Sequence, residues 1–119
     1  MLRPLKLIVI AALLWPVSGY ARPNSHGSYM VMGNGTTSCG TWTADRQGDR
    51  QYGPEEWILG YLTALNRVGP GSDDITRNTD AGGIFAWVDN YCATHPLDDI
   101  ATATIALGDV LLVADRKQP

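Results

Sequence analysis

The feature that most constrains how this chain folds is its pair of cysteines, Cys39 and Cys92, the only two in the sequence. Two cysteines allow one intramolecular pairing, and an even count in an exported chain is typical of a disulfide-bonded protein. A bridge between them would close a loop of about 50 residues and stabilise the fold by roughly 4 kcal/mol in the chain-entropy model. That contribution is comparable to the whole stability of a small domain. The sequence therefore predicts a small fold stapled by a Cys39–Cys92 disulfide.

The N-terminus indicates export. Arg3 and Lys6 form a short basic region, an apolar run follows over residues 7–17, and a small-residue pattern ends at Ala21. This is the layout of a secretory signal peptide. A membrane anchor is the alternative, but crossing a bilayer takes about 20 apolar residues and Pro16 interrupts the run. We expect cleavage after residues 1–21 and a periplasmic or secreted protein with no membrane span after cleavage.

The net charge of the mature chain limits the classes of partner that it is expected to bind. Removing Arg3 and Lys6 from the nine basic residues leaves seven against twelve acidic ones, a net charge of −5 for the mature chain. Phosphate binding needs a basic face, so this balance argues against a nucleic-acid partner. Protein clients or one protein partner remain the candidates, and a second copy of the chain, forming a homodimer, is another.

Helical periodicity organises the mature chain. Residues 22–37 are rich in Gly, Asn, Ser and Pro, which favours a flexible lead-in. A helical domain is expected over 38–113, followed by a frayed tail over 114–119. Its predicted helices cover about 38–47, 54–68 after a cap at Gly53, 81–94 after a cap at Asp80, and 96–113 after a cap at Thr94 or His95. No alternating strand pattern competes with them, so the fold class is all-α with about four helices. Gly60 is expected to let a neighbouring helix approach.

The stretch NYCATHPLDD, residues 90–99, concentrates residue types used in catalysis and in metal binding. Cys92 and His95 lie three positions apart, on one face of a helix. Neither a catalytic site nor a metal site has the further groups that it needs. A structural zinc site needs about four ligands, and the only other histidine is His26. Asp98 and Asp99, as neighbours on a helix, point about 100° apart and do not converge on one substrate atom.

The sequence therefore predicts no catalytic residue, no metal site, no cofactor and no enzymatic activity. Acidic residues at helix starts are interpreted as partners of the positive end of the helix dipole. Glu55 and Glu56 are predicted in the first turn of the second helix, and Asp98 and Asp99 in the first turn of the last.

Aromatic side chains are numerous for so short a chain. Most belong in a core, but short helices cannot bury all of them on one side. A partly exposed apolar surface that holds a client or a partner is therefore a hypothesis. The candidate residues for this surface are Trp42, Trp57, Tyr61 and Trp87.

Three segments together resemble the HdeA/HdeB family of periplasmic acid-stress chaperones: SCGTW at 38–42, YGPEEWILGYLTALN at 52–66 and YCATHPLDDIATATIAL at 91–107. The resemblance covers about residues 38–112, with Cys39 and Cys92 matching the two cysteines of the family. The segment 88–107 also resembles the final helices of periplasmic immunity proteins that neutralise type VI secretion amidases.

The first resemblance implies a chaperone that works without ATP and responds to acid. Carboxylates protonate below about pH 4, and the contacts that they make then weaken. The candidate pH-responsive carboxylates are Glu55, Glu56, Asp80, Asp98 and Asp99. The second resemblance implies the alternative function, a folded immunity or inhibitor protein that binds one specific protein partner.

Overall fold

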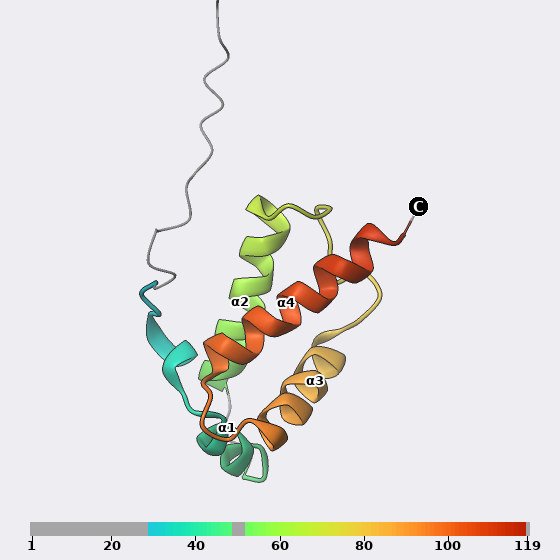
Figure 1. Ribbon diagram of the computed structural model, residues 1–119. Coiled ribbons are helices and arrows are strands. Elements are labelled where there is room, and N and C mark those ends of the chain that lie inside the picture. Colours follow the sequence, from blue (N-terminus) through green and yellow to red (C-terminus); the bar gives the residue numbers. More distant parts are fainter. Residues whose placement is uncertain (1–28, 49–51, 119) are drawn as a thin grey trace, which may run out of the picture.

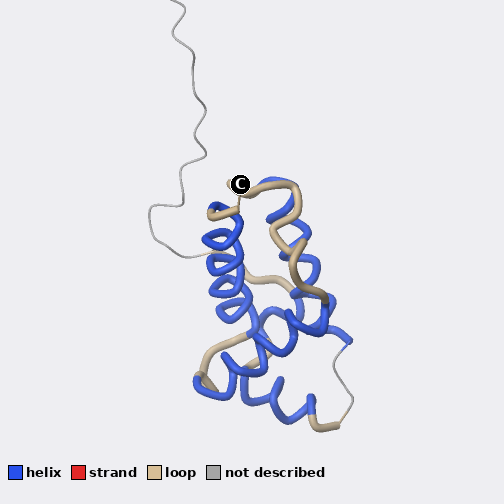
Figure 2. Tube along the Cα trace, turned by 90° about the vertical axis from the view of Figure 1, so that its right-hand side faces the viewer, coloured by secondary structure: helices blue, strands red, loops and turns tan. Residues whose placement is uncertain are grey.

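The computed structural model describes residues 29–48 and 52–118 and has the predicted all-α fold (Figure 1). A short 3-10 helix and four α-helices account for its regular structure (Figure 2). These elements are η1 (Gly33–Thr36), α1 (Cys39–Arg46), α2 (Tyr52–Val68), α3 (Ala81–Thr94) and α4 (Ile100–Arg116). The predicted signal peptide and residues 22–28 lie outside the described residues.

Three of the helices begin at a side chain that caps the exposed amides of the first turn. Ser38 accepts a hydrogen bond from the Thr41 amide, Asp80 from the Gly83 amide and Asp99 from the Thr102 amide. Such caps are typically worth about 1 kcal/mol each. The predicted cap at Asp80 and the predicted span of α3 are confirmed.

The predicted start of α4 is wrong. The Asp98 amide donates to the His95 carbonyl at 3.1 Å, so residues 95–98 form a turn with Pro96 in its second position. Asp99 then caps the helix, and neither Thr94 nor His95 does. Both aspartates therefore precede the first turn. The far end also differs, because α4 continues through the predicted tail to Arg116.

Part of the predicted lead-in is built into the domain. The η1 segment packs against α2 and α4, and the Trp57 indole donates to the Met32 carbonyl at 2.7 Å. Gly35 is buried beneath the Trp57 ring, where an added Cβ would lie 2.5 Å from two ring carbons. The domain therefore begins before residue 38 because an aromatic side chain of α2 holds this segment.

The core lies around the Cys39–Cys92 disulfide, which is confirmed. All four α-helices contribute to it, and its buried residues are Cys39, Trp42, Ile58, Leu62, Ile84, Val88, Cys92, Ile100, Ala103 and Leu107. Ile75 and Leu112 are also buried but lie outside this cluster. They form a small satellite core beneath the loop that joins α2 to α3.

The glycine that brings two helices together is Gly108, not Gly60. Gly108 is buried, and an added Cβ would lie 2.8 Å from Leu65 Cδ1 on α2. Gly60 is exposed and has nothing within 4 Å of an added Cβ. At the end of α2, an added Cβ at Gly69 would lie 2.4 Å from the Leu65 carbonyl oxygen. Backbone cannot yield as a flexible side chain does, so Gly69 is fixed as glycine.

Gly60, within α2, and Gly69, just after its end, should respond to substitution by alanine in opposite directions. Gly60→Ala should raise the free energy of unfolding by up to about 1 kcal/mol, because alanine is the better helix former and meets nothing. Gly69→Ala should lower it by about 1–3 kcal/mol through overpacking against backbone. Urea unfolding followed by far-UV circular dichroism measures both. Equal effects at the two positions would contradict the described end of α2.

Candidate functional site

The stretch NYCATHPLDD, residues 90–99, contains a junction between the starts of α1 and α4. The Cys39 amide donates to the Asp98 carbonyl at 2.8 Å, and the Gly40 amide to the Pro96 carbonyl at 3.2 Å. In return, the Ile100 amide donates to the Thr37 carbonyl at 2.9 Å. First-turn amides have no partner within their own helix. Here each helix start supplies acceptors for the other, beside the disulfide that joins α1 to α3.

Asp89 on α3 binds side chains from two successive turns of α1. Its carboxylate accepts from the Trp42 indole at 2.8 Å and from Arg46 Nε and Nη2, each at 2.8 Å. The hydrogen bond to Asp89 is the largest cause that raises the pKa of Arg46 above its ordinary value. The Trp42 side chain is 1% exposed. One carboxylate therefore accepts a hydrogen bond from the indole of a fully buried tryptophan and also forms an ion pair at the surface.

Glu55 extends this contact to α2. The Arg46 guanidinium also donates to Glu55 Oε1 at 3.3 Å, so a single cation links the acidic groups of α2 and α3. Glu56 is exposed and forms no hydrogen bond or ion pair with the described residues. Of the two glutamates predicted as pH-responsive, Glu55 makes a contact that protonation would weaken.

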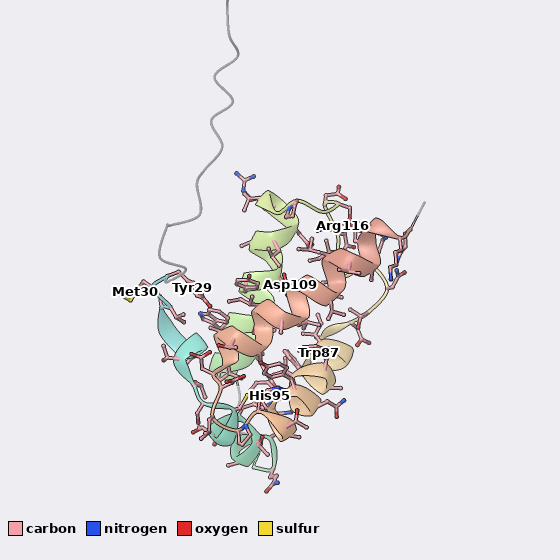
Figure 3. All side chains as sticks on the ribbon, in the orientation of Figure 1. Tyr29, Met30, Trp87, His95, Asp109 and Arg116 are labelled. Carbon is pink, nitrogen blue, oxygen red and sulfur yellow. A yellow bond between two sulfur atoms is a disulfide. The ribbon has the colours of Figure 1, made fainter. Side chains whose placement is uncertain are left out.

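Asp98 holds the turn 95–98 onto α3. The Tyr91 hydroxyl donates to Asp98 Oδ2 at 2.7 Å, and this bond is the largest cause that raises the pKa of Tyr91. Tyr91 stands in a stack with Trp87 and His95, at ring-centroid distances of 5.6 and 4.2 Å (Figure 3). The histidine that suggested a metal site is thus the exposed end of an aromatic stack.

Asp115 near the end of α4 fastens the loop between α2 and α3. It accepts from the Ser72 amide at 2.9 Å and the Ser72 hydroxyl at 2.7 Å, and it pairs with Arg77. The two bonds from Ser72, followed by the bond from Arg77, lower the pKa of Asp115 to about 2. This carboxylate remains ionised under conditions that protonate ordinary aspartates.

The predicted aromatic surface is only partly present. Trp42 is not on the surface, because its indole is needed in the core against Asp89 and Phe85. Trp57, Tyr61 and Trp87 are half-buried, and the first two stack at 5.8 Å. The strongly exposed apolar side chains lie elsewhere. They include Tyr29, Met30, Met32, Val68 and Leu97.

Asp89 and Asp115 are the functional candidates that sequence reasoning missed. Asp89 precedes Cys92 by one helical turn, while Trp42 and Arg46 follow Cys39 by one and two turns. Pairing the cysteines with α1 and α3 antiparallel would therefore have placed Asp89 opposite them. Asp115 gives no such signal, because its partners Ser72 and Arg77 lie in an irregular loop.

No protein-family model, curated protein or solved structure matches the chain. Over residues 29–48 and 52–118, no three His, Cys, Asp or Glu side chains gather closely enough to hold a metal ion. Among the described helices, none is long and apolar enough to span a membrane.

Loss of the Asp89 carboxylate should destabilise the protein through Trp42. Asp89→Ala leaves a buried indole N–H without this acceptor, so we expect the free energy of unfolding to fall by about 2 kcal/mol. Asp89→Asn keeps an oxygen acceptor and should cost about half as much, whereas Glu55→Gln should cost less than about 0.5 kcal/mol because its ion pair is at the surface. Urea unfolding at neutral pH measures all three. Equal costs for Asp89→Ala and Glu55→Gln would refute the role of Asp89.

Asp115 should stabilise the protein in a pH-dependent way. Its folded-state pKa of about 2 lies below the ordinary value of 3.8, so its contribution is complete above pH 4 and is lost as the pH falls towards 2. The difference in unfolding free energy between wild type and Asp115→Asn should therefore be constant from pH 7 to 5 and shrink between pH 4 and 2. Urea unfolding over this pH series tests it, and a pH-independent difference would count against the contact.

Proposed function

We propose that this protein is an ATP-independent acid-stress chaperone of the periplasm, acting by binding unfolded proteins and not by catalysis. The resemblance to the HdeA/HdeB family supports the proposal at the level of sequence pattern. The observation that carries it is structural: contacts between elements depend on ionised carboxylates. Asp89 joins α1 to α3, Asp98 joins the turn 95–98 to α3, and Asp115 joins the α2–α3 loop to α4.

Acid weakens contacts of this kind, although Asp115, with its pKa at about 2, keeps its charge to lower pH than an ordinary aspartate. Below about pH 4 ordinary carboxylates take up protons, and the ion pairs and charged caps that they form lose their electrostatic part. The net charge of the mature chain then changes from −5 to the positive charge of its seven basic residues, because the acidic residues are neutralised. Repulsion between like charges within the chain rises as a result. The helix caps at Asp80 and Asp99 are also carboxylates, and protonation would weaken them too.

The disulfide sets a limit to this opening. It joins Cys39 of α1 to Cys92 of α3 and does not depend on protons. Loss of the Asp89 contact would therefore loosen the packing of Trp42 against α3 while the disulfide keeps the two helices together. The result is a tethered apolar surface that is absent at neutral pH, which suits a binder of unfolded proteins under acid stress.

A second candidate function is a folded inhibitor that binds one protein partner at neutral pH. The exposed side chains of Tyr29, Met30 and Met32 favour it, because they are 59%, 82% and 73% exposed in the folded domain. Methionine-rich surfaces are adaptable binding sites. Such a protein would act without opening and would show no general protection of unfolded proteins.

The two functions differ in an aggregation assay. An acid-labile enzyme is held near pH 2 to 3 with the mature protein, neutralised and centrifuged, and the soluble enzyme is measured. We expect protection in acid, loss of near-UV circular dichroism over the same pH range, and no protection of a heat-denatured enzyme at pH 7. The double variant Cys39→Ser/Cys92→Ser, which lacks the tether, should protect less.

Native near-UV signal at pH 2 without protection would reject the chaperone function. A pull-down from envelope extract at neutral pH would then test the inhibitor function, with Met30→Ser/Met32→Ser as the variant expected to lose the partner. Retained capture by this variant would count against the exposed segment as the binding surface.

A further inference from the structure

The loop over residues 69–80, here called the strap, crosses from the end of α2 to the start of α3 without a regular helix (Figure 1). One of its side chains, Ile75, is only 5% exposed. Ile75 lies outside the main core and close to Leu112, since both would touch a Cβ added at Gly71. Satellite clusters beneath long loops unfold more easily than the main core.

The strap is fastened by few groups. Asp115 accepts hydrogen bonds from Ser72 near its start and pairs with Arg77 in its second half. The side chain of Asn66 on α2 accepts from the Ile75 amide at 2.9 Å. Arg77 Nε also donates to Gln118 at 3.0 Å. Of these acceptors, Asp115 is the one that acid can neutralise.

A small hollow lies between the strap and α4. This hollow of about 100 Å³ lies beside Ile75, and Leu111 and Ala114 are among its lining residues. This volume exceeds that of a water molecule, about 30 Å³, and gives an aliphatic side chain room. Asn66 recognises a main-chain amide. An acceptor for a main-chain N–H beside apolar side chains can hold the backbone of an extended segment with little regard to its sequence.

We propose that the strap covers a client-binding site, with Ile75 standing in for an aliphatic side chain of an unfolded client. Protonation of Asp115 releases Ser72 and Arg77, the strap lifts, and a client segment takes the place of Ile75 against Leu111 and Leu112. This inference rests on the proposed chaperone function and assigns its client site. The occupant is an extended, aliphatic segment of an unfolded protein.

The charges around Asp115 set the acidity at which the strap lifts. Arg77, from the strap, is the charged group that contacts it among the described residues. Arg67 near the end of α2 and Arg116 and Lys117 at the end of α4 are exposed cations, and none of them is among the groups that shift the pKa of Asp115. With the pKa of Asp115 at about 2, the strap should open after the contacts of ordinary carboxylates have weakened.

The test uses a client that is unfolded at every pH, so that opening of the strap is separated from acid denaturation of the client. Reduced and carboxymethylated α-lactalbumin carrying a fluorescent label is titrated with the mature protein at pH 7, and binding is read as anisotropy. The variants are Asp115→Asn, which imitates the protonated carboxyl, and Ile75→Ser, which removes the placeholder. Glu56→Gln, at an exposed carboxylate, is the matched control.

We expect both variants to bind at least about tenfold more tightly than wild type, because apparent affinity rises with the fraction of protein whose site is open. Glu56→Gln should bind like wild type. Adding Leu111→Ser to Asp115→Asn should remove the gain. Hydrogen exchange of the Ile75 amide, followed by NMR, should become faster in Asp115→Asn while the amides of α3 stay protected.

A protected Ile75 amide in Asp115→Asn would overturn the role of Asp115 as the latch. Faster exchange without client binding would overturn the site beneath the strap, while the acid assay on wild type would still decide the proposed function. If Asp115→Asn fails to fold, Ile75→Ser decides: binding supports the site, and no binding overturns it.

Discussion

The disulfide between Cys39 and Cys92 is the constraint on which the rest of the domain depends. It fixes α1 against α3 in an antiparallel register, which brings Trp42 and Arg46 opposite Asp89. It also places the start of α1 beside the turn 95–98, whose carbonyls accept the Cys39 and Gly40 amides. A covalent link thus sets the geometry, and ionised carboxylates supply the polar contacts that close it. Only the second kind of interaction responds to pH.

The two ends of the molecule combine these elements differently. The junction end carries the disulfide, which joins α1 to α3 whatever the pH. The strap end has no covalent link, but the bonds from Ser72 and the pairing with Arg77 keep Asp115 ionised to lower pH. The untethered strap is therefore held by a carboxylate that stays charged in mild acid.

Local signals in the sequence predicted the helices, the cap at Asp80 and the disulfide, because each depends on residues close together or on a unique pairing. They failed at α4, since Pro96 suits both the first helical position and the second position of a turn. Asp99 decided the outcome by capping the helix. Trp42 was placed on the surface because periodicity cannot tell which aromatic meets a partner in the core. The Ser72–Asp115 contact joins residues 43 positions apart through an irregular loop, and no periodic pattern encodes it.

Burial of Trp42 bears directly on how the proposed chaperone would avoid self-association at neutral pH. A permanently exposed tryptophan surface would promote self-association at neutral pH. Here Trp42 is packed in the core and its indole N–H donates to Asp89, so its polar atom is satisfied inside the folded domain. Protonation removes the negative charge that favours this bond and leaves the indole with a weaker acceptor. The same contact therefore stabilises the closed domain and, in the proposed function, would couple its opening to acid.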